Sequence, residues 1–394
     1  MSRPLERRPS IPSRGATDSG IVLPTQCDET RQNRRMTRLA EPGEGITFEE
    51  LRKATRNRGM PLEALALDIT PVGMHYLLVH FDIPLVDTSG WSLRIGGNVA
   101  SPLDLSLDDL RSMPQATRVV TLECAGNGRT LMEPRPVDQP WGLEAVSTAE
   151  WTGVPLRSVL DLAKPGTDTV DVVFQGADRG RQSGIEDHYR RALSLQDAMG
   201  EDVLLAHTMN GRPLEPQNGA PMRLIVPGWY GMAHVKWLTE ILVSTERFDG
   251  IQHDAYRYRQ SEDDPGEPVT RIRVRSLMIP PGIPESFTRR RHIRPGAVHI
   301  RGRAWSGAGT ISQVEVAVNG SWHPADVAAP DERWAWQGWS WTWDAEPGEY
   351  TLACRATDTA GNVQPMDQVW NLRGVGNNAV QQVAVTVAAG PPSS

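Results

Sequence analysis

Cysteine is scarce in this chain, with three residues among 394, and they stand far apart at Cys27, Cys124 and Cys354. An odd and sparse set of this kind excludes a fold held together by disulfides. Apolar runs are short, and none reaches the roughly 18 residues of a membrane-spanning helix. Positive charge is not in excess either: the formal net charge is −7, which argues against a protein that coats nucleic acid.

Several motifs of common cofactor sites are also missing. No Gly-Lys-Ser/Thr follows a glycine loop, no Gly-x-Ser-x-Gly elbow occurs, and there is no Cys-x-x-Cys or His-x-x-Glu-His pattern. These absences argue against a P-loop, a serine-hydrolase elbow, a zinc site and an attached haem. The segment 374–379 has the glycine spacing of a dinucleotide site, but only residues 380–394 follow it, too few for a strand–helix–strand unit.

The length predicts two domains, since single domains run to about 100–200 residues. Residues 1–40 are rich in Arg, Pro and Ser without apolar periodicity, which predicts a disordered basic tail. Arg7 and Arg8 lack the apolar segment of an export signal, so we expect a cytoplasmic protein. The alternative is export that depends on a partner protein or on a different start of the chain. The first domain is expected at 41–262 and the second at 268–394, joined by a polar, acidic linker at 260–268.

The expected first domain mixes strands with short helices. Apolar and alternating runs predict strands at 75–81, 91–97, 118–122, 169–174 and 222–226. Thr47 followed by Glu50 predicts the capped start of a helix, and helical spacing predicts further helices at 105–113, 156–163 and 193–199. Because strands and helices do not alternate regularly, an α+β fold is expected rather than a doubly wound sheet.

The second domain carries eight of the 13 tryptophans, and its apolar residues alternate with polar ones at 314–318, 339–343 and 350–356. The pair Asn319-Gly320 after the first of these runs predicts a hairpin turn. Short strands separated by turn signals predict a β-sandwich in which most tryptophans belong to the core.

Cys124 is the strongest candidate for chemistry. It follows the expected strand at 118–122, precedes the small residues Ala125, Gly126 and Gly128, and has Arg129 five positions further on. Small residues allow the backbone to approach a bulky ligand, and a nearby cation favours the thiolate, which is a soft metal ligand or a nucleophile. On these residues alone, a buried cysteine in a turn is an equally good interpretation.

The stretch 122–129 (LECAGNGR) resembles the molybdenum-cysteine loop of the sulfite oxidase family of molybdopterin-dependent oxidoreductases. Further similar segments follow in the family's order, at 141–156, 189–198, 209–214, 226–228, 231–237, 302–305, 356–365 and 370–375. The resemblance covers roughly residues 65–385. It implies a mixed α/β molybdopterin-binding domain of bacterial type, without a haem domain, followed by an immunoglobulin-like domain that forms a homodimer.

The same resemblance implies roles for single residues. Cys124 would be the one protein ligand of molybdenum, while the other sulfur ligands would come from the pterin dithiolene. Arg129, Arg373 and Tyr189 would bind a small oxyanion, with Trp141 as the wall of the pocket, because guanidinium groups and hydroxyls donate well to oxyanions. Contacts to the cofactor would come from His80, Cys124, Ala125, Gly126, Asn127, His234 and Lys236. By itself, Arg373 could equally form a surface salt bridge, and Tyr189 could be an ordinary half-buried tyrosine.

Four positions depart from the family pattern. Leu78, Gly128 and Ala233 stand where the family often has arginine, and His188 replaces an acidic neighbour of the active-site tyrosine. The oxyanion pocket is therefore expected to carry fewer positive charges than in animal members.

The resemblance implies the oxidation of sulfite to sulfate by oxygen-atom transfer at a Cys-ligated molybdenum centre. Two electrons would pass to an external acceptor: a cytochrome, oxygen or another carrier. Two alternatives stay open: a molybdopterin reductase of another oxo-substrate, such as nitrate or a sulfoxide, and a non-catalytic binding protein that kept the fold.

Overall fold

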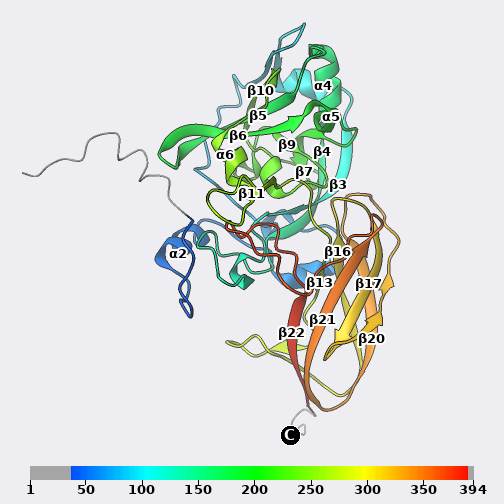
Figure 1. Ribbon diagram of the computed structural model, residues 1–394. Coiled ribbons are helices and arrows are strands. Elements are labelled where there is room, and N and C mark those ends of the chain that lie inside the picture. Colours follow the sequence, from blue (N-terminus) through cyan, green and yellow to red (C-terminus); the bar gives the residue numbers. More distant parts are fainter. Residues whose placement is uncertain (1–36, 389–394) are drawn as a thin grey trace, which may run out of the picture. The chain divides into compact units, whose positions relative to one another are not determined.

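The structure of the protein is a computed structural model in which residues 37–388 are described (Figure 1). Most of the expected basic tail, residues 1–36, therefore lies outside the described residues. Residues 37–40 do not continue a tail, because Ala40 N–H donates to Arg135 O at 2.8 Å and Val137 N–H donates to Arg38 O at 2.8 Å. The first helix, α2 (Phe48–Ala54), begins with the expected capping box of Thr47 and Glu50.

One mixed sheet has the strand order β2-β1-β10-β5-β6. Its strands are β1 (Ser92–Gly97), β2 (Leu103–Ser106), β5 (Asp171–Gln182), β6 (Ile185–Ser194) and β10 (Leu238–Ser244). Only β1 and β10 run parallel, and the other neighbours are antiparallel. The short helices are α3 (Leu107–Ser112), α4 (Leu156–Ala163) and α5 (Leu195–Ala198). Leu156 and Leu160 of α4 belong to the same buried core as Phe174 and Ile241 of this sheet.

A second sheet carries the cysteine loop at one strand end. It consists of β3 (Ala116–Glu123), β4 (Val146–Pro155), β7 (Leu204–Met209), β8 (Arg212–Pro213) and β9 (Arg223–Ile225). All its pairs are antiparallel, with β3 beside β4 and β9 beside β7. Val120 and Leu122 of β3 and Trp151 of β4 are buried in one core with residues of β7 and β9. This packing fixes the position of β3 and therefore of Cys124 at its end.

The segment 75–81 was expected to be a strand, and that prediction is wrong. Among residues 37–388 it forms only one bridge, from Leu77 to Arg58, and otherwise runs without a neighbouring strand. Its backbone groups form hydrogen bonds with side chains instead. Tyr76 N–H donates to Ser147 Oγ at 3.0 Å, Val79 N–H donates to Asn57 Oδ1 at 2.7 Å, and Leu78 O accepts from a lysine described below. Apolar periodicity cannot distinguish such a segment from a strand.

The C-terminal part is a β-sandwich, as expected. One sheet has the order β13-β16-β20-β19 and the other β14-β15-β22-β21-β17-β18. The strands are β13 (Arg275–Met278), β14 (Ile283–Pro284), β15 (Arg291–Ile293), β16 (Gly296–Trp305), β17 (Ile311–Val318), β18 (Ser321–Pro324), β19 (Asp326–Val327), β20 (Gln337–Ala345), β21 (Gly348–Asp358) and β22 (Gln381–Val387). Asn319 and Gly320 have φ of 47° and 85°, which forms the predicted turn. Trp339 and Trp343 are core residues.

Short elements complete the chain, and several border the site. They are the 3-10 helices η1 (Leu62–Ala66), η2 (Val72–Met74), η3 (Arg129–Leu131), η4 (Pro216–Asn218) and η5 (Gly231–Ala233), the helix α6 (Ile251–Ala255), and the paired strands β11 (Arg257–Tyr258) and β12 (Glu267–Pro268). The expected linker at 260–268 is thus the turn of a small hairpin. The mixed α+β part followed by the sandwich confirms the expected fold class.

Candidate active site

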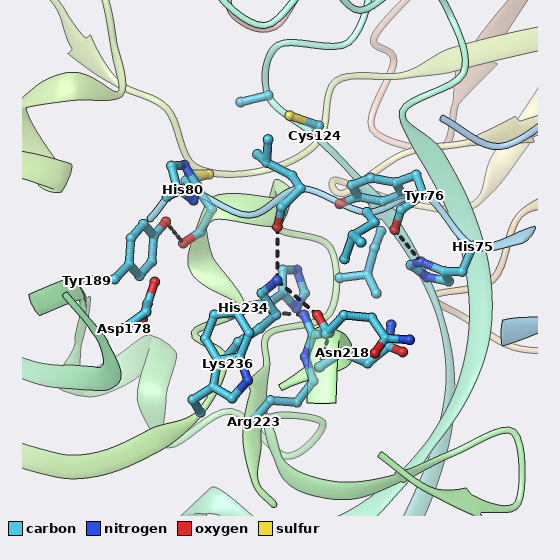
Figure 2. A pocket seen from close by; sticks show the side chains of 18 of the residues that line it. His75, Tyr76, His80, Cys124, Asp178, Tyr189, Asn218, Arg223, His234 and Lys236 are labelled. Carbon is cyan, nitrogen blue, oxygen red and sulfur yellow. Dashed lines mark hydrogen bonds between the residues drawn. The ribbon is translucent and has the colours of Figure 1, made fainter. Parts of the chain in front are cut away.

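Cys124 borders a cavity with an empty volume of about 700 Å³, which includes the solvent at its mouth (Figure 2). Six of the residues singled out in the sequence line it: His80, Cys124, Ala125, Tyr189, His234 and Lys236. The other lining residues are His75, Tyr76, Leu77, Leu78, Leu122, Asp178, Gln217, Asn218, Arg223, Gly231, Met232, Trp237 and Tyr256. They come from both sheets of the first domain and from the segment 75–81, so the cavity lies where these elements meet.

The thiol of Cys124 is held at the exit of β3. Cys124 N–H donates to Ala145 O, and Asn127 N–H donates to Cys124 O, both at 2.9 Å. The side chain is 5% exposed, and burial raises its pKa, while the charge of Arg129 acts in the opposite direction. The thiol is therefore protonated near neutral pH until a metal takes the place of the proton.

Glycine is required at position 126 because the guanidinium of Arg129 lies directly over it. A Cβ built there would come within 2.6 Å of Arg129 Nη2. Gly126 and Asn127 do not line the cavity. Asn127 shapes the loop instead, since its Nδ2 donates to Glu123 Oε1 at 3.0 Å and its Oδ1 accepts from Ala145 N–H at 3.1 Å.

The sandwich domain holds the cysteine loop from behind. Gly376 N–H donates to Ala125 O at 2.6 Å, and Asn377 Nδ2 donates to Gly128 O at 2.8 Å. A third contact runs the other way, from Arg129 Nε to Arg373 O at 3.1 Å. The segment 373–377, which overlaps the dinucleotide-like motif at 374–379, thus supports the loop of Cys124.

Glu123, the residue before Cys124, belongs to a buried ion pair. Glu123 binds Arg275 through Oε1, and its Oε2 accepts from Trp305 Nε1 at 2.8 Å. Glu123 and Arg275 are each 1% exposed. Arg275 comes from β13, so this pair joins the sandwich to the last residue of β3. In a dry environment such a pair fixes geometry, because breaking it would leave one charge uncompensated.

The floor of the cavity carries two cations without an acidic partner within 4 Å among residues 37–388. Arg223 donates to Asn218 O at 2.9 Å, and Lys236 donates to Leu78 O at 2.9 Å and Gln217 O at 3.1 Å. Burial lowers the pKa of Arg223 to about 10 and that of Lys236 to about 7. Arg223 is therefore charged at neutral pH, whereas Lys236 is charged in about half of the molecules, and an anionic group of a ligand would stabilise the charged form of both.

The opposite charge is supplied by Asp178 alone among the lining residues. Its side chain is 5% exposed, and its Oδ1 has no hydrogen-bond partner in the described part of the chain. Burial raises its pKa to about 6. Figure 2 shows Asp178 beside Tyr189 and Lys236. An unpaired carboxylate in this position suits the N–H groups of a heterocyclic ligand.

The rings of Tyr189 and His80 lie next to each other in the wall of the cavity. Their ring centroids lie 4.7 Å apart, Tyr189 Oη donates to Met232 O at 2.7 Å, and His80 Nε2 shares a hydrogen bond with Tyr256 Oη at 2.7 Å. Burial lowers the pKa of His80 to about 3 and raises the pKa of Tyr189. Both side chains are therefore neutral at physiological pH.

His234 lines the cavity, yet both of its ring nitrogens serve the fold. Nδ1 accepts from Val226 N–H at 3.1 Å, so Nε2 carries the hydrogen and donates to Trp229 O at 3.1 Å. Burial lowers its pKa to about 3. His234 can therefore contact a ligand through its ring surface rather than through a nitrogen.

Three of the expected oxyanion-binding residues lie beside the cavity rather than in its wall. Trp141 packs against Cys124, and its buried indole N–H faces the thiol, where it acts to lower the pKa of Cys124. Arg129 is 6% exposed and donates Nη1 to Gln139 O at 2.8 Å. Arg373 forms no ion pair within the described range, and its buried Nε has no partner there. A surface salt bridge therefore does not explain Arg373.

Sequence reasoning missed Tyr76, Asp178, Asn218, Arg223 and Tyr256. Arg223 had a usable signal, because it is the only charge within the apolar run 222–226, and a charge inside a buried strand needs a partner. Tyr76 was hidden in the segment misread as a strand. Asp178, Asn218 and Tyr256 gave no local signal, since only the tertiary fold brings them to the cavity.

Comparison with known proteins agrees with this geometry. Residues 80–252 match the family model described as "Oxidoreductase molybdopterin binding domain", and residues 267–388 match the "Mo-co oxidoreductase dimerisation domain". Sulfite oxidase of Gallus gallus is 35% identical over 347 residues, which is 81% of this chain and 73% of the relative. A nitrate reductase of Phaseolus vulgaris is 31% identical over 81% of this chain and 39% of the relative. The crystal structure of sulfane dehydrogenase SoxCD from Paracoccus pantotrophus shares the fold, with a TM-score of 0.72, 23% identity, and coverage of 95% of this chain and 96% of that one.

Fold, cavity and comparisons define a molybdopterin-dependent oxidoreductase. The chain belongs to the sulfite oxidase family. The match to a dimerisation domain supports the expected homodimer. Within residues 37–388, no helix is both long enough and apolar enough to cross a membrane.

The residues present fit the molybdenum cofactor on observations of this structure. A soft sulfur donor stands at one side of the cavity, two cations without acidic partners lie on its floor, and one carboxylate faces it without a partner. These are the chemical complements of a metal, an anionic group and an N–H-bearing heterocycle.

Proposed function

We propose that this protein oxidises sulfite to sulfate and passes two electrons to an external acceptor, such as a cytochrome or oxygen. One observation carries the proposal: the thiol of Cys124 borders the cavity, and two buried N–H donors, on Trp141 and Arg373, belong to the segments that surround its loop. The bound molybdenum cofactor would supply oxygen-atom transfer and accept the two electrons.

In this proposal the chain holds the cofactor at three points. Cys124 provides the thiolate ligand. Arg223 and Lys236 bind its anionic end from the cavity floor, where their charges lack acidic partners. Asp178 accepts hydrogen bonds from the heterocycle, which gives its free Oδ1 a partner. The proposed cofactor domain comprises residues 41–262, and the second domain comprises residues 268–394.

The substrate anion would be held beside Cys124 by positive charge and N–H donors. Arg129 is fixed by Gln139 O and Arg373 O, so its guanidinium presents a charge that needs no rearrangement. Arg373 contributes a donor that the described residues leave free, and Trp141 contributes the N–H that faces the Cys124 thiol. Tyr189 contributes its hydroxyl only after it gives up Met232 O.

The direct test compares oxidation with reduction. Purified protein with its cofactor is assayed for sulfite-dependent reduction of an artificial dye, and for nitrate- or sulfoxide-dependent oxidation of a reduced dye. The proposal predicts that sulfite gives the higher kcat/KM. Faster turnover of nitrate or a sulfoxide would assign the protein to reduction, and no turnover by cofactor-loaded protein would indicate a binding role.

Replacing Arg373 by alanine is expected to raise the KM for sulfite about tenfold or more, because a charge-assisted hydrogen bond contributes about 1.5–3 kcal/mol. The unfolding midpoint should change little, since the side chain forms no ion pair in the described range. Arg212→Ala, at an exposed position, is the matched control. An unchanged KM in Arg373→Ala would remove this residue from the pocket.

Replacing Arg223 by methionine is expected to lower the pterin and molybdenum content of the purified protein. Methionine keeps much of the volume over Trp151, on whose ring the guanidinium lies at 4.8 Å, but removes the charge. Pterin is measured by fluorescence after oxidative denaturation, and molybdenum by elemental analysis. Arg118→Met, in which a partly exposed partner of Asp202 is replaced, should keep its cofactor. Equal content in both variants would contradict the assignment of the cavity floor.

A further inference from the structure

Arg191 is a buried cation that has no part in the chemistry proposed above. It lies on β6 and is 4% exposed, and no acidic group lies within 4 Å of its guanidinium in residues 37–388. Its Nη1 donates to Gln252 O of α6, whereas its Nε is buried without a hydrogen-bond partner in the same range. Because an arginine stays charged when it is buried, this unpaired charge destabilises the fold and indicates a functional role.

The strand β6 places Arg191 behind the wall of the cavity. Alternate residues of a strand lie on the same face, so Arg191 shares a buried face with Tyr189. Its guanidinium carbon lies 5.6 Å from the ring centroid of Tyr256. Tyr256 lines the cavity, and its Oη shares the hydrogen bond of 2.7 Å with His80 Nε2. Arg191 therefore lies directly behind three residues that form one part of the wall.

The charge of Arg191 acts on this part of the wall. Burial raises the pKa of Tyr189 and lowers that of His80, and the positive charge of Arg191 acts to lower both. The sulfur of Cys124 is close enough that its charged form acts to raise the pKa of Tyr189. Figure 2 shows His80 and Tyr189 on a different side of the cavity from Arg223. Arg191 thus supplies positive charge to a region that Arg223 does not occupy.

A hydroxyl donor stands between Arg191 and the cavity. When His80 donates Nε2–H to Tyr256 Oη, the phenol hydrogen has no acceptor within the described part of the chain and is free for a ligand. A guanidinium over the face of the ring draws electron density from it, which makes the O–H a stronger donor. A small anion is the class of ligand that gains from both the charge and the donor.

We propose that Arg191 is a positioning residue that makes the wall formed by His80, Tyr189 and Tyr256 selective for a small anion. It acts through Tyr256 and takes the place of the arginine that the family often has at position 78, where Leu78 lines the same cavity. This role rests on the proposed function, since the anion in question is the substrate sulfite or its product sulfate.

The test is the equilibrium binding of sulfate to cofactor-loaded protein, measured by isothermal titration calorimetry beside the kinetics of sulfite oxidation. Arg191→Met is expected to raise the Kd for sulfate and the KM for sulfite about tenfold, as for the loss of one charge several ångström away in a partly buried site. The change in kcat should be smaller than the change in KM. Arg191→Lys keeps the charge and should recover most of the affinity. The unfolding midpoint of Arg191→Met should not fall, because the exchange removes a buried charge.

Arg190→Met is the matched control. Arg190 is the neighbouring residue of β6, but it is half-buried, pairs with Asp187 at 2.6 Å and lies over the ring of Phe248. Its Kd for sulfate should equal that of the wild type. Leu78→Arg added to Arg191→Met should restore binding, because it returns a guanidinium to the wall from another side. Molybdenum analysis and circular dichroism verify that each variant is loaded and folded.

A purely structural role for Arg191, in which it only holds Gln252 O, predicts the reverse pattern. Arg191→Met would then have a lower unfolding midpoint with an unchanged Kd and KM, which would overturn the inference and leave the proposed function intact. If the wild type bound nitrate more tightly than sulfate and Arg191→Met weakened that binding, sulfite oxidation would be contradicted while the role of Arg191 would stand. A loaded wild-type protein that binds neither anion would overturn both.

Discussion

Serine in place of Cys124 is expected to abolish turnover while the protein stays folded. The hydroxyl is a hard and weakly acidic donor, whereas molybdenum requires a soft thiolate here. The loss of kcat should exceed about 100-fold, the upper range for changes outside the ligand set itself. The unfolding midpoint of cofactor-free protein should shift by no more than about 4 °C, because the exchange alters one atom in a site that already opens to a cavity.

The matched control is Cys354→Ala. Cys354 is fully buried in the core of the sandwich, and burial raises its pKa to about 12. This variant should lose stability and keep its turnover per molybdenum. If Cys124→Ser retained turnover, or if Cys354→Ala lost it while folded, the assignment of the metal ligand would be wrong.

Methionine in place of Arg275 is expected to impair both stability and catalysis. It leaves Glu123 as an uncompensated charge at 1% exposure, which costs about 3–5 kcal/mol of unfolding free energy. Because Glu123 immediately precedes Cys124 and also anchors Asn127, the orientation of the thiolate should change as well. We expect turnover per bound molybdenum to fall about 10- to 100-fold, as for other residues that orient a metal ligand.

Arg303→Met is the control that separates the effect of Arg275 on the position of the thiolate from its effect on stability. Arg303 also joins the sandwich to the first domain, through Leu65 O at 2.8 Å and Asp68 at 2.7 Å, but it does not touch the cysteine loop. Its loss should lower the unfolding midpoint without changing turnover per molybdenum. In addition, Glu123→Gln combined with Arg275→Met should cost less stability than the sum of the single changes. If Arg275→Met lowered stability alone, the ion pair would have no positioning role.

Local patterns predicted most of the fold. The capping box at Thr47, the strand that ends before Cys124 and the turn at Asn319-Gly320 all occur as expected, because short-range chemistry determines them. The prediction of a strand at 75–81 was wrong for a physical reason. Its backbone groups bind the side chains of Ser147, Asn57 and Lys236, and no local sequence signal reports such distant partners.

The resemblance to the sulfite oxidase family predicted part of the site, and residues outside the family motifs were not predicted. Cys124, Tyr189, His80 and Lys236 meet at one cavity, whereas Gly126 and Asn127 shape the loop behind it. The predicted scarcity of positive charge rested on family positions such as Leu78 and Gly128. It could not foresee Arg223, which arrives from β9, or the support that Arg275 gives from the sandwich.

The central claim is that the sulfur of Cys124 binds molybdenum. X-ray absorption at the molybdenum edge tests it directly when wild type and Cys124→Ser are compared, both expressed in a host that makes the cofactor. We predict that the wild-type spectrum requires one more sulfur neighbour than the spectrum of any molybdenum retained by the variant. Identical sulfur shells in the two spectra, or a wild-type protein that contains no molybdenum, would contradict the account.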